Sequence, residues 1–147
     1  MNRFRFRLDS VLRVRAAEET NKKREFGTVL RQVKSEEDRL REIEENIARN
    51  DRLAEEMGGG RTSSAELMEL SRYAGALDRK KTAQEETIAR AEEFLDRKRG
   101  ELVEATRRKK TLERLRERSL LEHESAVRKD EQAVIDELAV QKHPPSQ

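Results

Sequence analysis

Hydrophobic residues recur along most of this sequence with the spacing of helices that pair along a narrow seam. Across residues 9–57 they fall on a seven-residue repeat that Glu19 interrupts. Its members are Leu12, Phe26, Val33, Leu40, Ile47 and Ala54, with Ala16, Leu30 and Ile43 at a second seam position. Across residues 64–140, spacings of three and four alternate along Leu67, Leu70, Ala74, Leu77, Lys81, Gln84, Ile88, Ala91, Leu95, Lys98, Leu102, Ala105, Lys109 and Leu112. This alternation is typical of a left-handed coiled coil.

A single strong internal break separates the two predicted helices. The stretch Met57–Ser64 reads MGGGRTSS, and consecutive glycines end a helix readily because they permit positive φ. Ser63 followed by Glu66 is a capping-box pattern, and Pro144 and Pro145 stop the second helix. The sequence therefore predicts an N-terminal arm at 1–8, a helix at 9–57, a turn at 58–63, a helix at 64–140 and a tail at 141–147.

A short turn makes the two helices antiparallel neighbours. Counted outward from the turn, residue i faces roughly residue 120−i. This rule places Glu37 near Lys81 and Gln84. It also places Glu19 near Lys98, and such polar pairs can fix the register of a coiled coil. The second helix then extends about 30 residues past the start of the first, an overhang of ~45 Å at 1.5 Å per residue.

The repeat changes where this overhang begins. After Leu112 the apolar positions resume at Leu120, Val127 and Val134, so four residues are added to the heptad count. Such an insertion locally unwinds a supercoil. The segment beyond it either runs alone or pairs with the N-terminal arm in a different geometry.

The composition supports paired helices over a compact core. Charged residues make up 44% of the chain and hydrophobic ones 33%, whereas a typical soluble domain is about 25% charged and 45–50% apolar. Disorder favours a large net charge, but 33 basic and 31 acidic residues nearly cancel here, to +2. The predicted fold is all-α: a long two-helix antiparallel coiled-coil hairpin whose second helix overhangs the first.

The N-terminal arm alternates arginines with apolar residues. Phe4, Phe6 and Leu8 take every second position, and an arginine precedes each of them. A period of two is not helical, and a hairpin offers these side chains no globular core. Two interpretations stay open: the phenylalanines fold back on the overhang near Leu120 or Val127, or they are kept for a partner.

Signals of catalysis and of metal binding are weak. The chain has no cysteine and two histidines, His123 and His143, without a metal-binding spacing around them. The glycines at 58–60 lack the Gly-Lys-Ser/Thr end of a phosphate-binding loop. A two-helix hairpin also offers no pocket that would shift the pKa of its many carboxylates. We therefore expect no enzyme activity, no cofactor and no metal site.

Binding to nucleic acid or to a membrane has one candidate, the basic run 107–110. Glu101, Glu104 and Glu113 flank it and no aromatic residue accompanies it, so a solvated basic stretch explains it better. No apolar run approaches the ~18 residues of a membrane span, and the basic start lacks the apolar region of a signal peptide. We expect a cytoplasmic protein without a transmembrane segment.

Over its full length the chain resembles the FliJ family of flagellar type III export proteins. Its start, Phe4-x-Phe6-x-Leu8-x-x-Val11-Leu12-x-x-Arg15, is similar to the opening pattern of that family. The long first helix, the glycine turn and the second helix agree in order and size. The end, RKDEQAVIDELA from Arg128 to Ala139, is similar to the acidic C-terminal signature of the family.

The resemblance implies a role in bacterial flagellum biogenesis, and so in motility and chemotaxis. Family members are cytoplasmic coiled coils similar to the stalk of rotary ATPases, associated with the inner membrane at the flagellar base. They bind the FliI-type export ATPase hexamer, promote its assembly and link it to the cytoplasmic domain of the export gate protein FlhA. A FliH-type ATPase regulator and export chaperones are further implied partners, and nucleic acid is not.

The resemblance also implies two sets of binding residues. The chain ends would enter the ATPase ring, with the contact residues Phe4, Phe6, Leu8, Leu12, Arg128, Asp130, Glu131, Gln132, Asp136 and Glu137. The start of the second helix would contact the export gate through Tyr73, Leu77, Lys80 and Gln84. Tyr73 and Leu77 keep the aromatic and aliphatic character of the family, while Lys80 and Gln84 depart from it.

Two other functions remain as alternatives. The first is a coiled-coil chaperone or scaffold of another type III secretion system, which would bind a different ATPase. The second is a basic protein that binds RNA or a membrane surface, whose affinity would fall steeply with salt.

Overall fold

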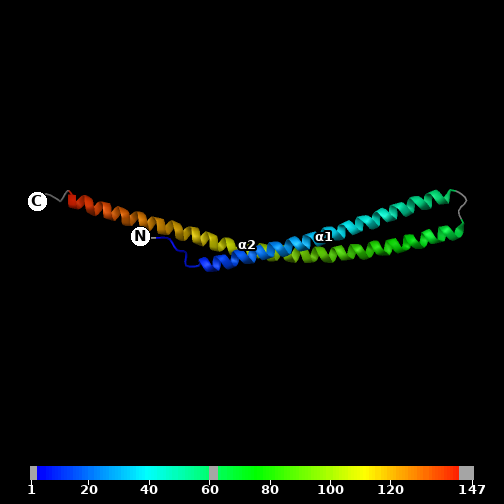
Figure 1. Cartoon of the computed structure of the whole chain (residues 1–147), viewed down its shortest axis with the longest axis horizontal. Helices are drawn as coiled ribbons and strands as arrows, with labels where there is room; N and C mark the ends of the chain where they lie inside the picture. The colour runs from blue at the N-terminus through cyan, green and yellow to red at the C-terminus, as the bar shows by residue number, and fades with distance from the viewer. Residues whose placement is uncertain (1–2, 60–62, 143–147) are drawn as a thin grey trace. The chain divides into compact units, whose positions relative to one another are not determined.

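A computed structural model describes residues 3–59 and 63–142 as two long helices and a short arm. Helix α1 spans Asp9–Gly58 and helix α2 spans Ser64–Lys142, and the described ranges contain no strand. The helices form an antiparallel hairpin and α2 continues past the start of α1 (Figure 1), which confirms the predicted fold class. Most of the predicted turn, at 60–62, and the tail at 143–147 with both prolines and His143 lie outside the described residues.

Helix α1 begins with a carboxylate in its first turn, and helix α2 begins after a capping serine. The Asp9 backbone N–H donates to the Phe6 carbonyl at 3.2 Å, and the Asp9 carboxylate pairs with Arg13 at 3.0 Å. A carboxylate in the first turn also suits the positive end of the helix dipole. At α2, the Glu66 backbone N–H donates to Ser63 Oγ at 3.3 Å, which is the N-cap half of the predicted capping box.

Contacts divide the chain into two units, and both helices run through each of them. The hairpin unit, residues 22–59 and 63–102, holds the main hydrophobic cluster. Val29, Val33 and Leu95 are buried there, and Phe26, Leu30 and Ala91 pack against them. Leu77 and Ile88 are also buried, as the spacing on α2 predicts. The seam is thin because each helix contributes one narrow stripe.

The second seam position of α1 differs in part from the prediction. It runs through Val29, Glu36, Ile43 and Asn50, all buried or half-buried, whereas Glu37 is exposed. Asn50 is 6% exposed, and its Nδ2 donates to the Leu70 carbonyl at 3.4 Å. Polar residues at these positions hide the repeat from a hydrophobic pattern, since an exposed helix face carries the same residue types.

The predicted polar pairs are wrong in detail. Gln84 Nε2 donates to the Glu36 carbonyl at 2.9 Å and to Glu36 Oε2 at 2.6 Å, so its partner is Glu36 and not Glu37. Lys98 pairs with Glu25 at 3.3 Å, and not with Glu19. The 120−i rule fits near the turn, where Gln84 meets Glu36. Further away it fails increasingly, by three residues for the pair Glu25–Lys98 and by eight for the pair Glu19–Lys109.

The base unit comprises residues 3–21 and 103–142. Here Glu19 is buried and pairs with Lys109 at 2.9 Å. Beyond the start of α1 the arm lies in its place: Phe4, Phe6 and Leu8 are half-buried while Arg3, Arg5 and Arg7 are exposed. From residue 128 to residue 142 every residue of α2 is exposed, so the end of the overhang has no partner within the described chain.

Candidate partner-binding surfaces

The N-terminal arm is folded back on α2. The Phe4 ring lies 5.6 Å from the His123 ring, centroid to centroid, with the planes tilted by 52°. The Arg116 guanidinium carbon lies 5.7 Å from the centre of the Phe4 ring, within cation–π range. The arrangement thus matches the fold-back interpretation, with His123 and Arg116 as the observed contacts of Phe4.

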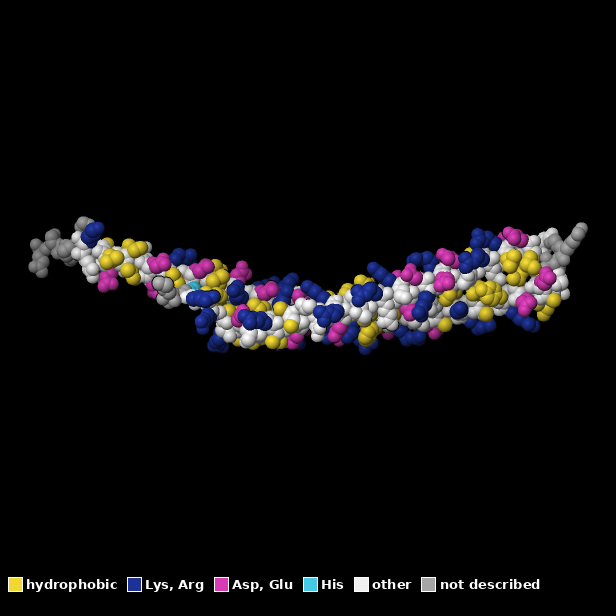
Figure 2. Space-filling model, in the orientation of Figure 1, with side chains coloured by type: hydrophobic (Ala, Val, Ile, Leu, Met, Phe, Trp, Pro, Cys, Tyr) yellow, Lys and Arg dark blue, Asp and Glu magenta, His cyan; other side chains and the backbone are white. Residues whose placement is uncertain are grey.

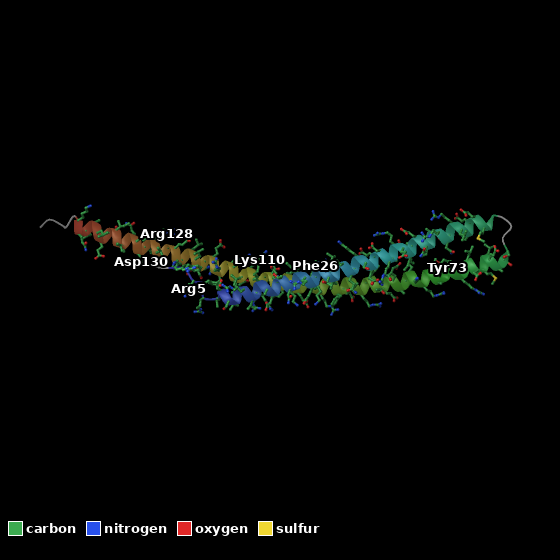
Figure 3. The ribbon with its side chains drawn as sticks, viewed as in Figure 1. Arg5, Phe26, Tyr73, Lys110, Arg128 and Asp130 are labelled. Atoms are coloured by element: carbon green, nitrogen blue, oxygen red, sulfur yellow. The ribbon has the colours of Figure 1, made fainter. Side chains whose placement is uncertain are left out.

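A basic hollow lies beside the folded arm. It has a volume of about 450 Å³ and is lined by Arg3, Phe4, Arg5, Phe6, Asp9, Arg13 and Arg116. Figure 3 labels Arg5 on this part of the chain. Because arginines outnumber the single carboxylate, which already pairs with Arg13, the hollow favours an anionic group.

The sequence-predicted ATPase-binding residues fall into two groups within the base unit. On the N-terminal side Phe4, Phe6, Leu8 and Leu12 are half-buried. On the overhang the residues are exposed, namely Arg128, Asp130, Glu131, Gln132, Asp136 and Glu137. Gln132 Nε2 donates to Asp136 Oδ1 at 2.9 Å, and Figure 3 labels Arg128 and Asp130 on this stretch. The arm contacts α2 before this polar end begins.

The overhang also exposes apolar side chains that the site prediction does not include. Val134, Ile135 and Leu138 are 56%, 57% and 58% exposed, and hydrophobic atoms are visible at the surface of this segment in Figure 2. Val134 and Ile135 share a shallow groove with Asp130 and Glu131. The signal was present in the repeat, since Val134 continues the seam positions beyond the end of the partner helix.

The predicted gate-binding residues in the hairpin unit are only partly accessible. Tyr73 is 50% exposed and Lys80 is exposed, but Leu77 is 4% exposed because it packs in the seam. Gln84 is half-buried and its amide donates to Glu36. A partner at this place would therefore contact Tyr73 and Lys80 directly, with Leu77 beneath them.

Near the turn, Tyr73 borders a groove that was not predicted. Its apolar lining comes from Leu53, Met57, Leu70 and Tyr73, and its acidic lining from Glu66 and Glu69. Figure 2 shows hydrophobic side chains at the surface near this end of the hairpin, and Figure 3 labels Tyr73 there. The groove therefore extends the accessible surface around Tyr73 toward the turn.

A network of ion pairs joins the two helices in the hairpin unit. Lys22 lies 3.3 Å from Glu25 and 3.4 Å from Glu101, and Lys98 lies 3.3 Å from Glu25 and 3.2 Å from Glu101. The hydrogen bond from Lys22 is the main cause that lowers the pKa of Glu25. The hydrogen bond from Lys98 likewise lowers the pKa of Glu101. The main cause of each shift is a partner three residues away on the same helix, and the partner on the opposite helix adds to it.

In the base unit the Glu19–Lys109 ion pair also joins the two helices. The hydrogen bond to Glu19 is the main cause that raises the pKa of Lys109.

Among residues 3–59 and 63–142, no group of three His, Cys, Asp or Glu side chains is arranged to hold a metal ion. Within those same ranges no helix is long and apolar enough to cross a membrane.

Comparison with known proteins gives a match to a protein family. The chain matches the family described as Flagellar FliJ protein over residues 4–146. No curated protein and no solved structure matches it. The family match spans the arm, both helices and the overhang, and so includes both candidate surfaces.

Proposed function

Since the chain belongs to the FliJ family, and so is a component of the flagellar export apparatus, we propose that it acts as the stalk of the export ATPase. In this role the end of α2 and the N-terminal arm bind the FliI-type hexamer and promote assembly of the ring. Its hairpin unit contacts the cytoplasmic domain of FlhA. The protein works in the cytoplasm at the inner membrane, together with a FliH-type regulator and export chaperones.

The observation that carries this proposal is the exposed face at the end of α2. Val134, Ile135 and Leu138 are more than half exposed, on a segment where every residue from 128 to 142 is exposed. An exposed apolar face rimmed by polar residues is a mark of a binding surface. Asp130 and Glu131 form such a rim beside Val134 and Ile135, and basic groups on a ring would complement them.

The folded arm adds a second element to this surface. Phe4 and Phe6 are half-buried and line the basic hollow, and Phe4 contacts α2 through His123 and Arg116. The pair therefore has two roles in the proposal: it steadies the overhang, and its arginine neighbours present positive charge to the ring.

The contact with the export gate is made by the accessible residues of the hairpin unit. Tyr73 and Lys80 supply the direct contacts, and the groove between Leu53, Met57 and Leu70 extends them toward the turn. Leu77 contributes indirectly, because it is buried in the seam and holds the two helices together at this point.

The test measures ATP hydrolysis by the flagellar ATPase of the same organism, with and without the full chain, and the size of the complex. Faster turnover with hexamer formation is expected. The double variant Val134→Asp and Leu138→Asp should weaken the interaction by about tenfold or more, because truncated or charged anchor positions typically cost over ~1 kcal/mol each.

A matched control places two aspartates on exposed apolar positions of the hairpin unit, Met68→Asp and Ala76→Asp. This control should stimulate the ATPase as the original chain does. Tyr73→Ala should weaken binding to the FlhA domain and leave ATPase stimulation intact. Equal stimulation by the overhang variant and the control would refute the assignment of the ring contact to the overhang.

A further inference from the structure

The outer face of α2 in the base unit carries a row of basic side chains. The row, which we call the basic row, consists of Arg107, Lys110, Arg114 and Arg118. Spacings of three and four keep these residues on one face of the helix. All of them are exposed, and the Arg107 side chain is 70% exposed. None of the four residues faces the seam.

Most of this positive charge is uncompensated. Lys109 lies in the seam, where Glu19 and Glu113 both pair with it. Arg107 has one ion pair, with Glu104 at 3.4 Å. For Lys110, Arg114 and Arg118, no salt bridge to another residue of the described chain is found. The acids that flank this stretch in the sequence therefore pair with Arg107, Arg108 and Lys109 and leave the other three members of the row charged.

Apolar side chains accompany the row on the same face. Val103 is 51% exposed and Leu121 is 60% exposed, and they precede and follow the basic residues at helical spacing. Between them a shallow hollow of about 290 Å³ is lined by Thr111, Arg114, Leu115 and Arg118. Two guanidinium groups beside a leucine surface suit a phosphate that is attached to an apolar body, because arginine binds phosphate through paired N–H donors.

We propose that the basic row binds the headgroups of anionic phospholipids and lays this stretch of α2 along a membrane surface. Basic residues interleaved with apolar ones on one helix face are the pattern of interfacial binding. From Arg107 to Arg118 the row spans about 17 Å at 1.5 Å per residue, which is enough to cover several headgroups. The inference deepens the proposed function, on which it rests for its cellular setting, since it gives the chain its own contact with the membrane.

The row fits other anionic partners less well. It carries no aromatic side chain on which bases could stack, and no Asn or Gln that could read a base edge. A second copy of this chain would meet the charges of the row with exposed carboxylates, and isolated exposed ion pairs contribute little to binding. A lipid surface instead presents many phosphates at once and also accepts Val103 and Leu121 at its boundary.

The experiment is co-sedimentation of the full chain with vesicles, in the absence of any export protein. One set of vesicles holds phosphatidylcholine alone, and the other holds equal parts of phosphatidylcholine and phosphatidylglycerol. We expect binding to the anionic vesicles only, decreasing as salt is added. The triple variant Lys110→Gln, Arg114→Gln and Arg118→Gln should bind on the order of a hundredfold more weakly.

The matched control removes three exposed charges from the hairpin unit, with Lys34→Gln, Arg52→Gln and Arg79→Gln. This control should bind vesicles as the original chain does, and circular dichroism should show equal helicity in both variants. Failure to bind anionic vesicles, or equal loss in both variants, would overturn the proposal. Tighter binding to single-stranded RNA than to vesicles, lost in the row variant, would assign the row to nucleic acid instead.

The lipid-free ATPase measurement keeps the two proposals separate. The row variant should stimulate the ATPase normally, because the row is not part of the proposed ring contact. A chain that binds vesicles but does not stimulate the ATPase would remove the stalk function alone. A chain that stimulates the ATPase but ignores vesicles would remove the lipid contact alone.

Discussion

Polar side chains inside the seam do much to specify how the helices pair. Glu19 is 4% exposed, and a carboxylate at such a place is tolerated only with a partner, because removing a charge from water is costly. Lys109 provides that partner from the opposite helix at 2.9 Å. Gln84 similarly meets both a carbonyl and a carboxylate oxygen of Glu36. Each pairing is satisfied in one register of the two helices and lost in the others.

We predict an asymmetry between single and double changes at the Glu19–Lys109 pair. Lys109→Ala leaves the Glu19 carboxylate buried without its lysine, so it should lower the free energy of unfolding more than the double change Glu19→Ala and Lys109→Ala does. Urea denaturation followed by circular dichroism measures both. Lys110→Ala, at the exposed neighbouring position, should change stability by less than about 0.5 kcal/mol. A double variant that is less stable than the single one would contradict the prediction.

At the scale of the element, α2 changes its role along its length. Its seam residues pack against α1 in the hairpin unit, as Leu77, Ile88 and Leu95 show. Its last stretch, from 128 to 142, packs against nothing in the described chain. The helix remains continuous because backbone hydrogen bonds and good helix formers carry it past the seam. Stability and binding are thus assigned to different stretches of one element.

This division predicts different costs for similar truncations along α2. Leu95→Ala removes a side chain from the main cluster and should lower the free energy of unfolding by about 2–5 kcal/mol. Val134→Ala, on the overhang, should change it by less than about 0.5 kcal/mol. Both are measured by urea denaturation of the full chain. A large loss at Val134 would mean that the overhang is packed in solution.

The sequence predicts the helices well because their hydrophobic spacing is long and regular, and the bounds of both helices agree to within two residues. It misses the polar seam residues Asn50 and Glu36, because nothing in their chemistry distinguishes them from exposed helix residues. The sequence also does not show which predicted gate-binding residues are accessible. Leu77 has the aliphatic character that the family pattern requires, but only the structure shows that it is buried in the seam between the helices. Burial depends on the partner helix, which a one-dimensional pattern does not contain.

For the whole molecule, ion pairs within and between the helices link stability to pH. Glu25 and Glu101 have pKa values below the ordinary 4.5, mainly through Lys22 and Lys98 respectively. Lys22 and Lys109 have pKa values above the ordinary 10.5, mainly through Glu25 and Glu19. The two carboxyl groups with lowered pKa values stabilise the fold above pH 4.5, and this contribution is lost as the pH falls below that value. The two lysines with raised pKa values stabilise the fold below pH 10.5, and this contribution is lost as the pH rises above that value.

We therefore predict a broad plateau of thermal stability between these limits, with a decline on both sides. The acid decline should become shallower in the variant Glu25→Gln and Glu101→Gln, which is also less stable on the plateau. Thermal melts followed by circular dichroism across the pH range provide the measurement. Because the Glu25 and Glu101 side chains are 42% and 43% exposed, the effect of these two groups should shrink in high salt. An acid limb unchanged by these substitutions would show that other carboxyls govern it.

The non-helical backbone of the arm has a consequence for how the covered part of α2 can be exposed. Residues 3–6 belong to no helix or strand, and residues 7 and 8 form a turn before α1. The arm lies on α2 through alternating side chains, and no backbone hydrogen bond joins the described part of the arm to α2. A competing helix could therefore displace the arm from α2 without breaking a single turn of α1 or α2. The helix would then cover the surface of α2 that the arm had covered, while the hairpin stays folded.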